Sequence, residues 1–183
     1  MRDIFPDGLM TLDGLEVTGN TAATARWLNC DQSSISRVYR RVSEQLELGF
    51  CKQARGYGAT SNQQLLRCLR QAAQLHRLLK QPLRLQWLNL SAREPMAALA
   101  TPFQPIPCRP CSPRRAQELV QQRVIDLVLC DGTVANALPA AELPVAELSS
   151  RTLEGGQRVV MLQELEHHPA LQQLIAALNA LPA

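Results

Sequence analysis

The sequence predicts an α/β protein with an N-terminal winged helix-turn-helix, a long linker helix and a small C-terminal α/β domain. Before Pro82 the apolar residues recur at helical spacing, and after it short apolar runs alternate with proline-containing connections. Two glycines flank Tyr57, which is typical of a hairpin tip. The expected domains are residues 1–60 for the winged helix-turn-helix, 61–82 for the linker helix and 83–183 for the C-terminal domain.

Two short helices are expected at the start of the chain. Three leucines at helical spacing indicate the first helix, although Gly14 weakens that prediction. These leucines are Leu9, Leu12 and Leu15. Asn20 is a favourable N-cap for a second helix over residues 21–28.

A third helix is expected over residues 32–48, with Asp31 as its candidate N-cap. Its apolar residues step by four, three and four positions, which predicts one buried stripe that includes Tyr39. The stripe consists of Ile35, Tyr39, Val42 and Leu46. Two short helices joined by a tight turn have the spacing of a helix-turn-helix.

The other side of the third helix is polar and basic. It consists of Gln32, Ser33, Ser34, Ser36, Arg37, Arg40 and Arg41. Gln and Arg form bidentate hydrogen bonds with base edges, and Ser and Arg bind phosphates. Thr21, at the start of the second helix, is expected to hold a phosphate with the positive end of that helix. DNA binding is therefore expected, the alternative being a basic helix face that is merely solvated.

Residues 50–60 predict a hairpin in the position of a wing, with Arg55 at its tip near the minor groove or the phosphates. Thr60 or Ser61 is expected to cap a long helix that ends near Lys80. The apolar residues of this helix are Leu65, Leu69, Ala72, Leu75 or His76, and Leu79 along one side, with Leu66 and Ala73 beside them. Because a small winged domain cannot cover so much apolar surface, we expect the helix to pair with a second copy of itself.

The positive charge of the chain is concentrated in its first half. Residues 1–82 contain 11 Lys and Arg against 7 Asp and Glu, a net charge of +4. Residues 83–183 contain 8 against 9, a net charge of −1. The excess lies where a surface that neutralises phosphates is expected.

Several motif positions follow one another along the first 80 residues. They are Leu9, Leu12, Leu15, Gly19, Asn20, Thr21, Ala25, Leu28, Gln32, Ile35, Ser36, Arg40, Leu46 and Thr60. In these positions the chain resembles the LysR-type transcriptional regulators, whose second helix opens with a Gly-Ser pair and whose recognition helix carries Gln-Pro-Ala-Val-Ser.

Six positions depart from that family pattern. Thr24 replaces an Ala, Ser33 the Pro, Glu47 a Gly, Cys51 a Phe, Gln53 an Arg before the wing, and Gln63 a Gly. The loss of the Arg removes one expected phosphate contact. Since each substitution keeps rough size or polarity, the chain is interpreted as a divergent member.

The resemblance implies a sequence-specific transcriptional regulator that binds double-stranded DNA as a homodimer through the linker helix, with RNA polymerase as a further partner. The C-terminal part resembles one lobe of a periplasmic-binding-protein-like effector domain, since only about 100 residues follow Pro82. A truncated effector domain without a complete inducer pocket is therefore expected. Asn89, Ser91 and Thr133 follow predicted strands and are weak candidates for ligand contacts. Helix capping and turn formation are the preferred roles for these three residues.

The C-terminal part predicts five strands and three helices, the first of them capped by Ser91 after the first strand. The strands are expected at residues 83–88, 106–108, 125–130, 143–148 and 158–162, and the other two helices at 112–122 and 169–181. Ile125 to Cys130 is expected to be a buried parallel strand, and Ser112 an N-cap.

The cysteines and histidines give no sign of a metal or catalytic site. Cys108 and Cys111 form a C-x-x-C with no second pair and no nearby His, so they are interpreted as small apolar residues near a strand end, with a metal or redox role as the alternative. Cys30, Cys51 and Cys68 are expected in the core of helices or strands. The sequence contains no phosphate-binding glycine loop and no nucleophile elbow. We therefore expect no metal, no cofactor and no enzyme activity.

No run of about 18 apolar residues and no signal-peptide core occur, so a cytoplasmic protein that does not bind membranes is expected. The alternative function is a protein-interaction module. Such a module would sequester a related regulator without binding DNA itself.

Overall fold

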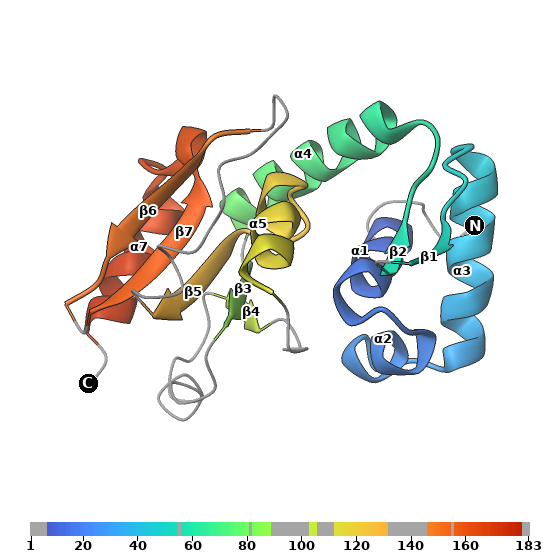
Figure 1. Ribbon diagram of the computed structural model, residues 1–183, viewed down its shortest axis with the longest axis horizontal. Helices are drawn as coiled ribbons and strands as arrows, with labels where there is room; N and C mark the ends of the chain where they lie inside the picture. Colours follow the sequence, from blue (N-terminus) through green and yellow to red (C-terminus); the bar gives the residue numbers. More distant parts are fainter. Residues whose placement is uncertain are drawn as a thin grey trace. The chain divides into compact units, whose positions relative to one another are not determined.

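The computed structural model describes residues 7–54, 56–80, 82–88, 103–105, 112–131, 146–154 and 156–180. The fold is mixed α/β and divides into two compact units, Met1–Ala73 and Gln74–Ala183 (Figure 1). The boundary between the units falls within the long helix α4, Gln63–Lys80. Each unit has its own buried apolar core.

The first unit begins with three helices, α1 (Leu9–Thr18), α2 (Thr21–Trp27) and α3 (Gln32–Gln45). The predicted cap of α2 is confirmed, since the Asn20 side chain accepts a hydrogen bond from the Ala23 N–H at 2.7 Å. Asp31 occupies the N-cap position of α3, but its side chain makes no capping hydrogen bond. The third helix ends three residues before its predicted end.

Gly14 lies where α1 and α2 approach closely. A Cβ atom at this position would lie 2.7 Å from Cγ2 of Thr24 and 3.3 Å from the Trp27 ring. Thr24 is fully buried, and its hydroxyl is within 2.7 Å of the Thr18 hydroxyl. The glycine that weakened the helix prediction is therefore explained by helix packing, because no larger residue fits at this crossing.

The core of the first unit combines the leucines of α1 with the apolar stripe of α3. Ile35 and Val42 are buried, and Tyr39 and Leu46 are partly buried against the same core. The predicted stripe is thus confirmed. The buried residues of the whole core are Leu9, Leu12, Leu15, Ala25, Ile35, Val42, Leu48, Phe50 and Leu66.

A two-stranded antiparallel hairpin follows α3, formed by β1 (Cys51–Gln53) and β2 (Gly56–Gly58). An aromatic cluster of Tyr39, Phe50 and Tyr57 fastens the hairpin to α3, with ring centroids 5.8–6.4 Å apart. Burial raises the pKa of the Tyr57 hydroxyl, and the neighbouring Tyr39 acts in the same direction. Arg55 lies outside the described residues.

The start of α4 differs from the prediction. The helix begins at Gln63, and the Thr60 and Ser61 hydroxyls do not cap it. They donate instead to the Gly49 carbonyl at 3.0 Å and the Glu47 carbonyl at 2.6 Å. Because these carbonyls follow α3, the two hydroxyls fasten the entry of α4 to the exit of α3.

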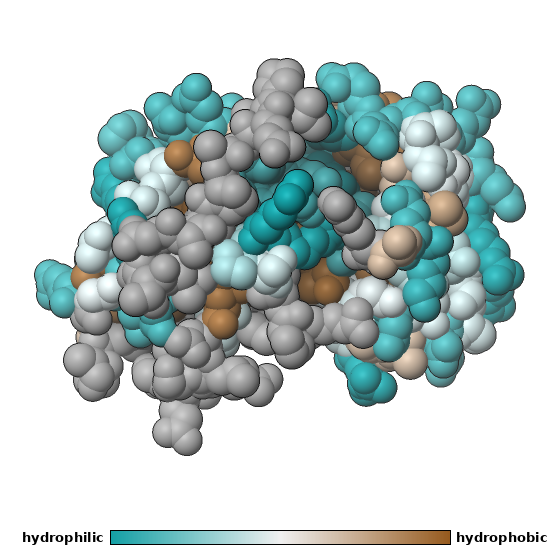
Figure 2. Space-filling model, viewed as in Figure 1, coloured by the Kyte–Doolittle hydropathy of each residue, from teal (hydrophilic) through white to brown (hydrophobic). Residues whose placement is uncertain are grey.

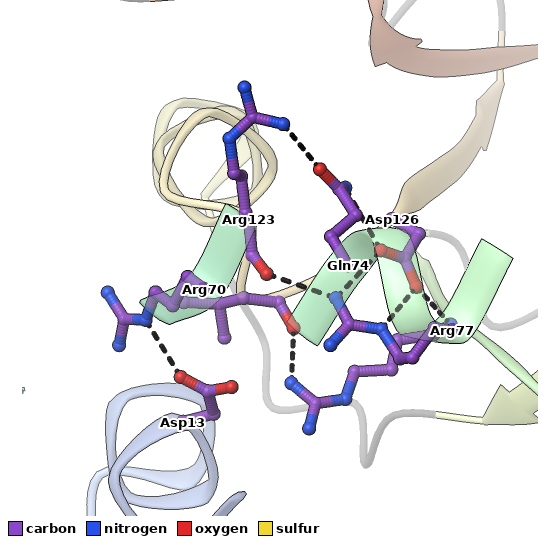
Figure 3. A network of polar contacts seen from close by, with 8 residues as sticks. Asp13, Arg70, Gln74, Arg77, Arg123 and Asp126 are labelled. Carbon is purple, nitrogen blue, oxygen red and sulfur yellow. Dashed lines mark hydrogen bonds and ion pairs between the residues drawn. The ribbon is translucent and has the colours of Figure 1, made fainter. Parts of the chain in front are cut away.

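A buried arginine connects α4 with α1. Arg70 Nε donates to Asp13 Oδ1 at 2.8 Å (Figure 3). Arg70 Nη2 donates to Glu16 Oε1, also at 2.8 Å. All three residues are buried. Burial opposes the charge on Arg70, but the Glu16 and Asp13 carboxylates outweigh it and raise the pKa of the guanidinium above its usual value. The carboxylates on α1 thus have their counter-charge within the first unit.

The second unit contains a five-stranded sheet in the order β4-β3-β5-β7-β6. The strands are β3 (Leu83–Trp87), β4 (Phe103–Pro105), β5 (Leu127–Asp131), β6 (Leu148–Thr152) and β7 (Gln157–Leu162). β3 runs parallel to β4 and β5, whereas β7 is antiparallel to both β5 and β6. The sheet is therefore mixed rather than wholly parallel.

Two strands differ from their predicted positions. β4, Phe103–Pro105, was not predicted, and the strand predicted at residues 106–108 lies outside the described residues. Of the strand predicted at residues 143–148, residues 143–145 lie outside the described residues, and β6 starts only at Leu148, the last predicted position.

The helices of the second unit are α5 (Pro113–Gln121), the short 3-10 helix η4 (Gln163–Leu165) and α7 (Pro169–Asn179). Ser112 caps α5 as predicted, accepting from the Arg115 N–H at 3.2 Å. The apolar face predicted for α7 is also confirmed, and its members Leu171, Leu174, Ile175 and Leu178 are buried.

Asp126 is the centre of a buried polar network in the second unit. Its carboxylate accepts from Gln74 Nε2 at 3.0 Å, from Arg77 Nε at 2.9 Å and from the Arg84 backbone N–H at 2.8 Å (Figure 3). Arg123 in turn donates to Gln74 Oε1 at 2.6 Å. The last turns of α4 are therefore held to the second unit by charge-assisted hydrogen bonds.

Candidate nucleic-acid interface

The polar residues of α3 lie on the side opposite its buried stripe. We call Gln32, Ser33, Ser34, Ser36, Arg37, Arg40 and Arg41 the α3 polar face. Gln32, Ser33, Arg37 and Arg40 are exposed, and Ser34, Ser36 and Arg41 are half-buried. Hydrophilic residues cover much of the surface over α3 (Figures 1 and 2). The predicted residues are thus brought together on one accessible helix face.

Two contacts orient basic side chains on this face. Arg37 Nη2 donates to the Ser34 hydroxyl at 3.4 Å, a long hydrogen bond. The Arg40 guanidinium carbon lies 5.8 Å from the centre of the Tyr39 ring, within cation–π distance. Exposed acidic residues stand at both ends of the helix, Asp31 before it and Glu44 near its end. The positive charge is therefore concentrated in the middle of α3.

The starts of α2 and α3 meet through their side chains. Gln32 Nε2 donates to the Thr21 hydroxyl at 2.8 Å, although eleven positions separate the residues along the chain. Both were candidate site residues from the sequence. Their contact with each other was not predicted, because it depends on the angle between two helices.

The hairpin adds one basic residue that the sequence analysis did not single out. Lys52 is exposed on β1, where it pairs with Tyr57 of β2. The sequence did contain a signal for Lys52, since it is a basic residue within a strand of the predicted wing. Arg55 itself lies outside the described residues, so its role at the hairpin stays a prediction.

One face of α4 exposes apolar side chains in a regular pattern. Leu65, Leu75 and Leu79 are 41%, 50% and 76% exposed. Cys68 and Ala72 are also exposed, and the five positions step by three, four, three and four. We call these five residues the α4 stripe. Their spacing is the heptad spacing of helices that pair side by side.

The α4 stripe differs in part from the predicted apolar side. Leu69 is only half-buried but packs against the core of the first unit, so it belongs to the inner side of the helix. Cys68 takes its place in the stripe. Leu66 is buried and Ala73 packs against the same core, as their position beside the stripe implied.

The expectation that three cysteines belong to the core was wrong. Cys30, Cys51 and Cys68 are all exposed free thiols. Cys30 lies in the turn before α3, Cys51 on a hairpin strand and Cys68 on the α4 stripe, and none of these positions faces a core. Cys130 of β5 is buried, and this burial raises the pKa of its thiol.

The remaining candidates lie mostly outside the described residues. Asn89, Ser91 and Thr133, the weak ligand candidates, belong to this group, as do Cys108 and Cys111. Within the described ranges, no group of three or more His, Cys, Asp or Glu is arranged to hold a metal ion. None of the described helices has both the length and the apolar character needed to cross a membrane.

The sequence matches no family model and has no significant match among curated proteins. Its structure is similar to solved transcriptional regulators. For ArgP from Mycobacterium tuberculosis the identity is 16% and the TM-score 0.39, over 80% of this chain and 51% of that one. For a full-length OxyR variant from Pseudomonas aeruginosa the identity is 10% and the TM-score 0.45, over 80% and 53%.

CbnR, a LysR family transcriptional regulator, is 18% identical with a TM-score of 0.30, over 78% of this chain and 54% of its own. The chain thus spans about half the length of these solved structures.

Proposed function

We propose that the first unit is a winged helix-turn-helix that binds double-stranded DNA and that the chain acts as a transcriptional regulator. The observation that carries the proposal is the α3 polar face, which is accessible along the helix while the opposite stripe is buried. An α-helix with this division fits the major groove of B-DNA. The hairpin after α3 has the position of a wing.

In the proposed complex the α3 polar face is divided by function. Gln32, Ser33 and Arg37 approach base edges, while Arg40 and Arg41 neutralise phosphates. The half-buried hydroxyls of Ser34, Ser36 and Thr21 serve as phosphate donors or as supports for neighbouring side chains. Arg55 at the hairpin tip remains a predicted contact to the backbone or the minor groove.

The α4 stripe supports a homodimer as the active species. A single large apolar side chain on a surface needs no explanation, but five positions at heptad spacing along one helix present a continuous apolar face. Pairing with the same face of a second copy buries these side chains. A two-fold dimer presents two α3 helices, and its DNA site is then pseudo-palindromic.

The second candidate function uses the same α4 stripe without DNA. A chain that buries this stripe against the matching helix of a related regulator would sequester that regulator. The acidic residues at both ends of the α3 polar face favour this candidate, because they weaken the attraction of α3 to phosphates. The lack of a complete inducer pocket, RNA polymerase as a partner and the cytoplasmic location remain predictions.

Retention on immobilised duplex DNA at several salt concentrations separates the two candidates. A DNA-binding protein elutes at a salt concentration set by the number of phosphates it contacts, and its affinity falls steeply as salt rises. Selection from a random DNA pool then identifies the preferred site. Elution without salt dependence, combined with a stable dimer, would favour the sequestering module and overturn the DNA-binding proposal.

A further inference from the structure

The hydrogen bond between Gln32 and Thr21 joins two side chains whose backbones are both held rigidly. Thr21 directly follows Asn20, whose side chain caps α2. The Asn20 carbonyl accepts hydrogen bonds from the hydroxyls of Thr18 at 3.0 Å and Thr24 at 2.9 Å. Gln32 is the first residue of α3, which the buried side chain of Ile35 fixes to the core.

The contact determines which atoms of the Gln32 amide remain available. A glutamine amide has two N–H donors and one carbonyl acceptor, and the bond to Thr21 uses one donor. The carbonyl oxygen and the second N–H remain for a ligand. The major-groove edge of adenine presents the complementary pair, the N6 donor and the N7 acceptor.

We propose that Thr21 is a positioning residue that orients the Gln32 amide for adenine in the major groove. This inference rests on the proposed function, because it requires that α3 enters the groove. Without the Thr21 hydroxyl, the exposed Gln32 side chain is free to rotate and to exchange the positions of its oxygen and nitrogen. Recognition then loses both pre-organisation and the choice between adenine and guanine.

The test uses the DNA site selected by the full chain and the same site with guanine in place of the adenine that Gln32 contacts. The ratio of the two affinities is measured for the wild type, Thr21→Val and Thr21→Ser. Thr21→Val keeps the shape of the side chain but removes the hydroxyl, and we expect it to lower the ratio about 3- to 10-fold, the range of one net hydrogen bond. Thr21→Ser retains a hydroxyl and should restore the ratio.

The ratio of the affinities for the adenine site and the guanine site separates a positioning role of Thr21 from its other roles. Loss of a phosphate contact or a partial loss of folding lowers the affinity for both sites equally, and this cancels in the ratio. The same measurement in a Gln32→Ala background provides the double-mutant cycle. There, Thr21→Val should no longer change the ratio.

Three outcomes would contradict the inference. If Thr21→Val changes the ratio equally with and without Gln32, Thr21 acts independently of it. If the wild type prefers guanine at this position, the amide has the opposite orientation. If the wild type shows no salt-dependent DNA binding, the proposed function fails first and the positioning role fails with it. If Thr21→Val does not fold, the free Thr21→Ser protein is measured instead. The NMR signals of the Gln32 side-chain amide then show whether a hydroxyl at position 21 holds that amide in one orientation.

Discussion

Arg70 of α4 and the exposed arginines of α3 have opposite environments, although all of them belong to the first unit. Arg70 of α4 is buried between the carboxylates of Asp13 and Glu16. Among the described residues, no carboxylate forms an ion pair with Arg37 or Arg40 of α3. Removing one partner of a buried ion pair leaves an uncompensated buried charge and is destabilising, whereas accessible charges are available to bind an external anion.

The comparison teaches that a count of basic residues says little about DNA binding. The first half of the chain has a net charge of +4, but the buried Arg70 and the largely buried Arg77 are neutralised inside the protein. The exposed basic residues of the first unit within the described ranges are Arg37 and Arg40 of α3, Lys52 of the hairpin, Arg26 of α2 and Arg67 of α4. The predictions below test this division, from the largest expected effect to the smallest.

Replacing Arg70 should destabilise the first unit strongly. Arg70→Met preserves the length of the side chain but leaves Asp13 and Glu16 buried without a counter-charge, which costs about 3–5 kcal/mol of unfolding free energy. Urea unfolding followed through amide NMR signals of α1 and α3 measures the loss. Arg67→Met is the matched control, because Arg67 is exposed on the same helix. Equal stability of the two variants would contradict the assigned role of Arg70.

The α4 stripe should control dimer formation. Leu79→Glu places a charge at its most exposed leucine, and loss of one buried leucine weakens association by about 1.5–3 kcal/mol per side chain. Sedimentation equilibrium measures the dimer dissociation constant. Gln71→Glu adds the same charge at an exposed position outside the stripe and should have a smaller effect. A monomeric wild type would remove the dimer from the proposed function.

The exposed residues of α3 should affect DNA affinity more than stability. Arg37→Ala and Gln32→Ala are each expected to weaken specific binding by about 1–3 kcal/mol. The change in unfolding free energy should stay within about 0.5 kcal/mol, as is usual for surface substitutions. Gel-shift titrations measure the affinity, with Arg114→Ala, an exposed arginine of the second unit, as control. Unchanged affinity in both α3 variants would rule out this placement.

The ion pair between Arg151 and Glu166 is partly exposed. Its environment therefore lies between that of the buried Arg70 and that of the accessible arginines of α3. The Ser149 hydroxyl at 2.7 Å and Arg151 Nε at 2.9 Å lower the pKa of the Glu166 carboxyl. A lowered folded-state pKa means that this contribution to stability is present above the ordinary pKa of glutamate and is lost as the pH falls through the lowered value. Ser149→Ala should therefore raise the pKa of Glu166.

An NMR titration of the Glu166 carboxyl measures that shift. The control is Ser150→Ala, which changes an exposed neighbour on the same strand. If both variants titrate like the wild type, the hydrogen bond from Ser149 has no influence on the carboxylate.

The sequence by itself determined the elements whose signals are local. Helical spacing located α1 and the α3 stripe, and Asn20 and Ser112 marked two helix starts. The glycines around Tyr57 indicated the hairpin, but they lie in strand β2 and not at its tip. These signals work because a cap or an amphipathic stripe is defined within a few residues of the same helix. The α3 polar face followed from the same periodicity.

Only the tertiary structure decided which faces are covered and which side chains meet. In the folded chain Cys68 is exposed, Leu69 packs against the core, and β7 runs antiparallel to β5. Arg70 donates hydrogen bonds to carboxylates more than 50 positions away along the chain. The contact between Gln32 and Thr21 belongs to the same class. Burial and long-range hydrogen bonds depend on the packing of separate elements, and no local pattern contains that information.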